Sequence, residues 1–211
     1  MKVISTNIGV ATAVLKNGKE VQTGIYKTSV DEPITLTKTG VVGDAVMDLK
    51  HNGGLDKACY LYSTDHYAFW KEKFPDLYWT WGMFGENLTI EGLNETKINI
   101  GDTFSVGSAV VQVSEPRRPC SVLGIRFGTQ NMVKLFNNSA YSGIYVRVVE
   151  EGKVKVGDEL KLLTSNESIT VAEVFSLFST QKKNVALAEK AIQCVYLAKS
   201  CIESIKEKYK G

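Results

Sequence analysis

Short runs of β-branched and aromatic residues, separated by turn-forming residues, dominate the first 165 or so residues of this 211-residue chain. The clearest case is the pair Val10–Leu15 and Glu20–Thr23, which flanks Asn17-Gly18 and so predicts a tight β-hairpin. Further strands are expected at Ile34–Lys38, Ala58–Tyr62, Asn87–Ile90, Ser108–Ser114, Gly143–Val149 and Leu160–Thr164. Many short strands with turns between them are typical of a closed or partly closed barrel. We therefore expect a mainly β, barrel-like domain.

Helical patterns interrupt this part of the chain at two places. Ser63 or Thr64 can cap a helix whose aromatic residues recur at helical spacing from Tyr67 onward, and Pro75 would stop it. A second, short helix is expected around Thr129–Asn137.

The character of the chain changes near residue 166. Thr170-Val171-Ala172-Glu173 has the form of a capping box, and further helices can start at Asn184 and Ser200. A unit of under 50 residues would hardly be stable alone, so it should pack on the barrel. We expect a main domain over residues 1–165 and a three-helix subdomain over residues 166–211.

The charge balance argues against two classes of partner. With 25 Lys and Arg against 23 Asp and Glu, and no long basic block, a nucleic-acid partner is not expected. No stretch approaches the roughly 20 apolar residues of a membrane span, and the N-terminus lacks the long apolar region of a secretory signal. We expect a cytoplasmic protein that does not bind membranes.

The cysteines indicate reduced thiols, because their spacing resembles neither a zinc finger nor a disulfide framework. They are Cys59, Cys120, Cys194 and Cys201. The relevant question is therefore which thiol is reactive.

Cys120 is the strongest candidate, in the run Pro116-Arg117-Arg118-Pro119-Cys120. The two prolines stiffen the segment directly after a strand, which fixes the direction of the thiol. Arg117 and Arg118 would lower the pKa of the thiol and favour the metal-ligating thiolate. A structural role stays open, because free cysteines are among the most buried residues.

Two further segments could contribute to a site. Gly53-Gly54 permits a backbone that cradles an anion, with Lys57 as a cation and His51 as a titratable group, although a plain turn fits the same pattern. In the segment from Trp81 to Thr89, Glu86 and Asn87 offer hydrogen-bonding groups at the start of a strand. Taken alone, this segment suits a structured loop better than a site. His66, on the first predicted helix, is expected to have a packing or surface role.

In this order, the motifs resemble the MOSC domain, named for the C-terminal domain of molybdenum cofactor sulfurases, and in particular its YiiM-like branch. The matching elements are Gly43-Asp44, Gly53-Gly54-Leu55-Asp56-Lys57-Ala58, His66-Tyr67 with Trp70, Phe84-Gly85-Glu86-Asn87-Leu88-Thr89, Gly92-Leu93, Ile100-Gly101-Asp102, Pro116-Arg117-Arg118-Pro119-Cys120, Gly143-Ile144-Tyr145 with Arg147, and Gly157-Asp158. The likeness spans about residues 1–165, and the helical tail is similar to the three-helix appendage of that branch.

The resemblance implies a pocket around Cys120, which would be the catalytic residue and the ligand of a molybdenum or of a sulfur atom. Arg117, Lys57, the Gly53-Gly54 turn and Asn87 would bind the molybdenum cofactor, a molybdopterin. His51 is a further candidate, but Asn52 stands where the family commonly has the histidine, and a shift by one residue reverses side-chain direction along an extended chain.

The function implied by the resemblance is a molybdenum-dependent oxidoreductase that detoxifies N-hydroxylated small molecules, such as hydroxylaminopurine-type bases. Its electrons would come from a separate electron-donor protein. A first alternative is a sulfur carrier that holds a persulfide on Cys120, received from a cysteine desulfurase partner that contains the pyridoxal phosphate. A second alternative is a binding module without turnover, with the helical tail as its docking surface.

Overall fold

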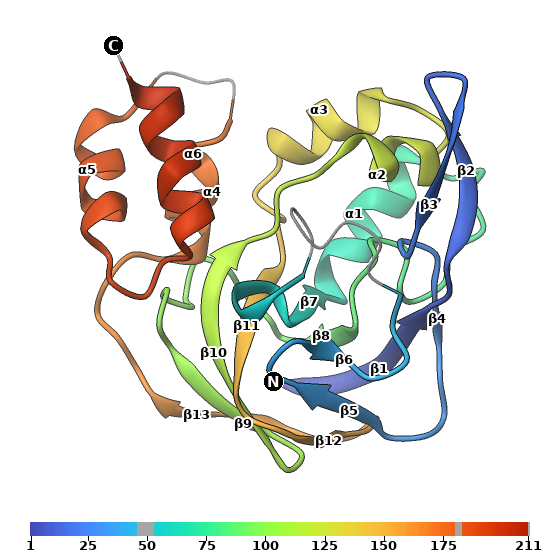
Figure 1. Cartoon of the computed structure of the whole chain (residues 1–211), viewed down its shortest axis with the longest axis horizontal. Coiled ribbons are helices and arrows are strands. Elements are labelled where there is room, and N and C mark those ends of the chain that lie inside the picture. Colours follow the sequence, from blue (N-terminus) through green and yellow to red (C-terminus); the bar gives the residue numbers. More distant parts are fainter. Residues whose placement is uncertain (46–52, 180–182, 211) are drawn as a thin grey trace.

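A curved eight-stranded sheet forms the centre of the computed structural model, which describes residues 1–45, 53–179 and 183–210 (Figure 1). In spatial order its strands are β13 (Leu160–Thr164), β9 (Thr103–Val106), β10 (Ala109–Pro116), β11 (Ile144–Glu150), β7 (Cys59–Ser63), β8 (Leu88–Glu91), β1 (Lys2–Gly9) and β4 (Lys27–Ser29). β7 and β8 pair in parallel, which requires the crossover that α1 (Asp65–Lys73) supplies. The prediction of a mainly β fold is confirmed.

The sheet does not close into a continuous barrel within the described residues. Residues Asn7–Gly9 of β1 pair with β4, so only the first residues of β1 are left to pair with β13 at the other end of the sheet. There the two ends of the sheet meet at one isolated bridge, Lys2 to Glu159, and the N–H of Leu160 donates to the Met1 carbonyl at 2.9 Å. Of the two arrangements that the sequence left open, a closed or a partly closed barrel, partial closure describes the sheet.

Two small sheets complete the β structure. β2 (Thr12–Lys16) and β3 (Lys19–Thr23) form the predicted hairpin, with φ values of 52° at Asn17 and 74° at Gly18 in its turn. The second small sheet contains β12 (Gly152–Val154), β5 (Ile34–Thr37) and β6 (Gly40–Val41).

The predicted helices appear in the predicted order, together with a 3₁₀ turn and one α-helix that were not predicted. A 3₁₀ turn, η1 (Leu55–Lys57), precedes β7, and α3 (Asn131–Asn137) is the predicted second helix. α2 (Ser121–Arg126), directly after Cys120, was not predicted, because it is short, contains Gly124 and lacks a side-chain cap.

Three helices end the chain, α4 (Val171–Ser176), α5 (Val185–Gln193) and α6 (Lys199–Tyr209), and they lie side by side at one end of the molecule (Figure 1). The capping box of α4 is confirmed. The N–H of Glu173 donates to Thr170 Oγ1 at 3.1 Å, and the N–H of Thr170 donates to Glu173 Oε2 at 2.8 Å.

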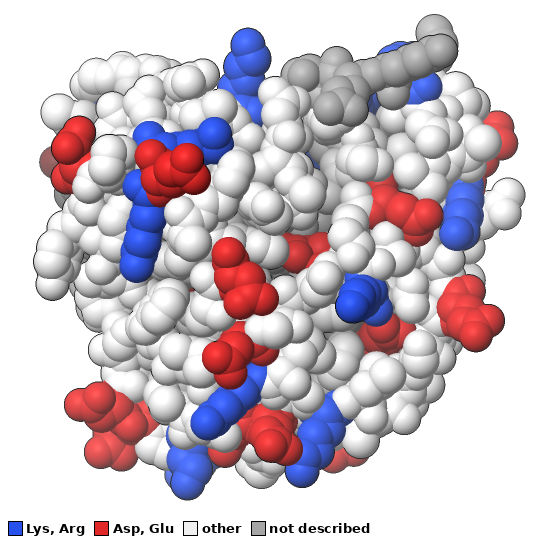
Figure 2. Space-filling model, turned by 180° about the vertical axis from the view of Figure 1, so that it is seen from behind, with Lys and Arg blue, Asp and Glu red and all other residues white. Residues whose placement is uncertain are grey.

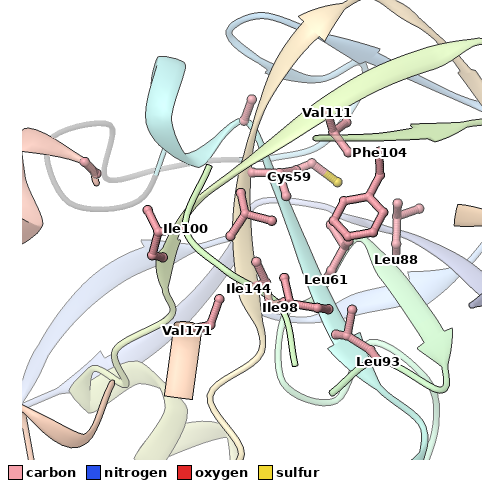
Figure 3. Packing of buried hydrophobic residues seen from close by; sticks show 14 of the residues in the cluster. Cys59, Leu61, Leu88, Leu93, Ile98, Ile100, Phe104, Val111, Ile144 and Val171 are labelled. Carbon is pink, nitrogen blue, oxygen red and sulfur yellow. The ribbon is translucent and has the colours of Figure 1, made fainter. Parts of the chain in front are cut away.

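One apolar cluster runs from the inner face of the sheet into these helices. Leu61 and Ile144 from the sheet lie near Val171 of α4 in the same cluster (Figure 3). A second, aromatic cluster surrounds α1 and α3, where Trp70 stacks on Phe136 with ring centroids 5.8 Å apart. These two cores hold the loops between the strand ends in place.

The surface carries mixed charge. On the side opposite to the view of Figure 1, Lys and Arg alternate with Asp and Glu, and the atoms described on that face show no extended patch of one sign (Figure 2). Within residues 1–45, 53–179 and 183–210, no helix has the length and apolar character needed to cross a membrane.

Candidate functional site

A cavity of about 640 Å³ lies between the β2–β3 hairpin, the ends of β7, β10 and β11, and the start of α2. Its cationic lining residues are Lys16, Lys27, Lys57, Arg117 and Arg118, and the acidic ones are Asp44 and Glu115. The described part of the lining therefore has an excess of positive charge, which favours an anionic ligand.

Cys120 lines this cavity from the segment that joins β10 to α2. Its backbone is extended, with φ −123° and ψ 171°, and the residue is half-buried. All four cysteines lie in the described part of the chain, and Cys120 is the one among them that lines the cavity. Burial raises the pKa of the Cys59 and Cys201 thiols, which keeps both protonated. The cavity thus contains a single accessible thiol.

Arg117 lies in the wall beside Cys120 and is only 5% exposed. Its guanidinium packs over the rings of Phe136 and Tyr60, at 5.0 Å and 5.6 Å from the ring centroids. Nη1 is buried and has no hydrogen-bond partner among the residues that the structure describes. Because a buried donor without a partner is costly, this atom favours an anionic or polar ligand.

Lys57 reaches the same cavity from η1, and its Nζ lies 3.3 Å from Oε1 of Glu115 on β10. Glu115 is 1% exposed, and burial raises the pKa of its carboxyl although Lys57 and Arg118 oppose the shift. Sequence reasoning missed Glu115, and the signal that could have found it is its place directly before the Pro116 motif.

Asn87 lines the cavity, but its side chain already has several partners. Its Oδ1 accepts the Tyr60 N–H at 3.2 Å, and its Nδ2 lies 2.9 Å from Asp44 Oδ2 and 3.3 Å from the Asn7 carbonyl. Asp44 also forms an ion pair with Lys27. Asn87 therefore joins three segments of the wall, and sequence reasoning missed the Lys27–Asp44 pair.

Of the two residues in the Gly53-Gly54 turn, one lines the cavity. Gly53 lines the cavity, whereas Gly54, with φ 80°, precedes η1 and is not among the lining residues. His51 lies outside the described residues. His66 pairs with the buried Glu95 at 2.9 Å and stacks on Tyr141, which confirms the packing role expected for it.

Together these residues could hold a cofactor that brings most of its own metal ligands. The described residues contain no group of three His, Cys, Asp or Glu side chains able to hold a metal. A soft thiolate, a cationic lining and an orphaned guanidinium donor fit a dithiolene cofactor that carries a phosphate.

The chain belongs to the MOSC domain family, whose sequence pattern matches residues 48–161. Within that family it is similar to YiiM proteins. The crystal structure of YiiM from Geobacillus stearothermophilus superposes with a TM-score of 0.81 at 29% identity, covering 98% of both chains.

Two curated relatives extend this comparison. The protein YflK of Bacillus subtilis (strain 168) is 38% identical over 207 residues, which cover 98% of this chain and 93% of YflK. A protein named reductase from Gibberella moniliformis is 36% identical over 150 residues, which cover 69% of this chain but only 26% of that protein.

Proposed function

We propose that this protein binds a molybdenum cofactor and reduces N-hydroxylated small molecules, such as hydroxylaminopurine-type bases. The observation that carries the proposal is the shared cavity of Cys120 and Arg117, in which a half-buried thiol lies beside a buried guanidinium with an orphaned donor. The likeness to a reductase supports the reaction class, and membership of the MOSC domain family supports the cofactor.

The residues of the cavity divide the task of holding the cofactor. Cys120 would be the metal ligand, because a thiolate suits a soft or intermediate metal. Arg117 would bind the phosphate through the donor that has no partner in the described structure. Lys57 would face the cofactor from η1 and add only a minor part of its affinity, Gly53 would line the cavity, and Asn87 would keep the shape of the wall. The bound cofactor would supply two-electron redox chemistry.

The wider organisation belongs to the same proposal. Residues 1–165 would form the catalytic domain, with residues 166–211 as a helical subdomain packed against it. A separate protein would supply the electrons, and the enzyme would act in the cytoplasm on a small molecule.

Metal and pterin analysis tests this function. Protein purified from a host that loads other molybdoenzymes should contain about one molybdenum and one pterin per chain, and Cys120→Ala should lose the metal. Cys194→Ala is the matched control, because Cys194 is also half-buried but does not line the cavity. Wild-type protein without molybdenum from such a host would contradict the proposal.

A sulfur carrier is the second candidate, favoured by the partial exposure of Cys120 in an otherwise walled cavity. In this role Cys120 would receive a persulfide from a pyridoxal-phosphate-dependent desulfurase. Mass spectrometry after incubation with desulfurase and cysteine should show one added sulfur on Cys120. An unmodified thiol under these conditions would exclude the carrier role.

A further inference from the structure

The ion pair of Lys57 and Glu115 is an unusual feature of the cavity wall. Both residues line the cavity, and their side chains are 11% and 1% exposed. Removing two charges from water costs free energy that their mutual attraction offsets only in good geometry. An ion pair at this position therefore suggests a functional role in addition to any contribution to the stability of the fold.

The surrounding backbone holds both partners in place. The hydroxyl of Ser114, next to Glu115, hydrogen-bonds to the carbonyl of Asp56, next to Lys57, and to the carbonyl of Tyr145 at 2.8 Å. These contacts join η1, β10 and β11 at the point where Lys57 enters the cavity. The Lys57 ammonium also lies 5.8 Å from the centroid of the Tyr145 ring. The direction of the Lys57 side chain is thus set by η1, β10 and β11.

The C-terminal helices shield Glu115 from solvent on its other side. The N–H of Ala198 donates to the Ser114 carbonyl at 3.1 Å. Cys201 on α6 is buried, and the nearby Glu115 carboxylate adds to the effect of burial in raising the pKa of its thiol. Among the residues that the structure describes, the charged and titratable groups that face Glu115 are Lys57 and Asp56 from η1, Arg118 from the motif, Tyr145 from β11 and Cys201 from α6. Of these, Lys57 is the cation in the cavity wall at ion-pair distance.

Lys57 and Arg117 therefore differ in their partners and in their ability to release a proton, although both are cations that line the same cavity. Arg117 has a buried donor without a described partner, and its proton is not released in proteins. Lys57 has a carboxylate counter-charge and can give up a proton. The geometry thus gives the arginine an anion-binding role and the lysine an acid role.

We propose that Lys57 is the proton donor for the reduction of the N–O bond, and that Glu115 is the positioning residue that holds its ammonium in the cavity. This inference rests on the function proposed above. In the reaction, two electrons and two protons convert an N-hydroxylamine to an amine and water. The N–O bond breaks, and one new N–H and one new O–H bond form.

Each proton and electron in this reaction has a source. The two electrons come from a separate flavin or iron–sulfur electron-donor protein. Lys57 gives its proton to the departing hydroxyl oxygen, which leaves as water, and the neutral amine takes a new proton from solvent. The proton that the substrate nitrogen gains also comes from solvent.

Substitution of the pair in the loaded enzyme tests the assignment. Lys57→Met should retain molybdenum and pterin but lower kcat about 100-fold, with little change in KM, because general acids contribute factors of this order. Glu115→Gln should lower kcat less and move the alkaline limb of its pH profile to lower pH, because the ammonium loses its counter-charge. The matched controls are Lys161→Met and Glu159→Gln, from an exposed pair with the same 3.3 Å separation, and both should leave kcat unchanged.

A second readout needs no cofactor. Infrared pH titration of cofactor-free protein follows the carboxyl band that Glu115→Gln removes, and Lys57→Met should move the midpoint of this band to higher pH. An unmoved midpoint, full kcat in Lys57→Met, or loss of molybdenum and pterin from Lys57→Met would each overturn the inference. Wild-type protein that never contains molybdenum would overturn the proposed function itself, so the two failures are distinguishable.

Discussion

Asn87 and Asp44 meet on the cavity wall, where Nδ2 of Asn87 donates a 2.9 Å hydrogen bond to Oδ2 of Asp44. The same carboxylate accepts the N–H of Gly9 at 2.8 Å and pairs with Lys27. The side chains of Lys27 and Asp44 are 7% and 3% exposed. A buried carboxylate therefore joins β1, β4 and the segment before β8 at the edge of the candidate site.

Asp44→Asn should lower the free energy of unfolding by about 3–5 kcal/mol, because it leaves the Lys27 ammonium buried without a counter-charge. Urea denaturation measures the change. Glu159→Gln breaks an ion pair whose side chains are 69% and 62% exposed, and should cost at most about 1 kcal/mol. The double variant Lys27→Met, Asp44→Asn should recover part of the loss. Equal effects of Asp44→Asn and Glu159→Gln would show that burial of the pair has no energetic consequence.

Glu86 should make stability depend on pH in a direction opposite to that of a paired surface carboxylate. It is fully buried and accepts bonds from the N–H of Gly82 and the hydroxyl of Thr89, both at 2.9 Å, yet burial raises the pKa of its carboxyl. The folded state therefore binds the proton more tightly than the unfolded state does. The stabilisation that Glu86 contributes should be fully present below its ordinary pKa of about 4.3. It should be lost as the pH rises through the pKa that Glu86 has in the folded state.

Urea midpoints measured over a pH series would detect this effect as the difference between wild type and Glu86→Gln. As the pH rises above about 4.3, the urea midpoint of the wild type should fall relative to that of Glu86→Gln. The exposed Glu207→Gln provides the control and should follow the wild-type slope. A difference that grows in favour of the wild type over this range would contradict the argument.

Arg117→Met should separate cofactor binding from folding. Methionine keeps much of the apolar contact with Phe136 and Tyr60 but removes the buried charge, so the free energy of unfolding should stay within about 1 kcal/mol of wild type. Pterin and molybdenum content should fall about tenfold or more, since a charge-assisted hydrogen bond contributes about 1.5–3 kcal/mol. Lys134→Met, on the surface-facing side of α3, should retain both. Full cofactor content in Arg117→Met would remove this arginine from the site.

Phe175→Ala should show that α4 shares a core with the rest of the chain. Phe175 is 2% exposed, and its ring meets that of Phe136 edge-on at 6.1 Å, so truncation should cost about 3–5 kcal/mol. Denaturation followed by circular dichroism should remain a single transition. Val195→Ala, at a residue 85% exposed, should change stability by no more than about 0.5 kcal/mol. A separate early transition of the C-terminal helices would contradict the shared core.

Features that depend on neighbouring residues were predictable from sequence. The Asn17-Gly18 turn has the positive φ values that its residue types favour, and the capping box of Thr170 and Glu173 forms as its spacing requires. Asn184 likewise caps α5 by accepting the N–H of Leu187 at 3.1 Å. α2 escaped prediction because no such local signal marks it. Its first residues follow Cys120 without a capping side chain.

The sequence by itself determined the mainly β character, the order of the motifs and the choice of Cys120, Arg117 and Lys57 as candidates. Those inferences rest on local periodicity, on turn chemistry and on the resemblance to a family. Only the tertiary structure decided that Lys57 faces Glu115, that Asp44 neutralises Lys27, and that α6 seals Glu115 from solvent. Each of these pairings joins segments that are separated along the chain. Whether a charge finds a partner there depends on sheet order and burial, which neighbouring residues do not encode.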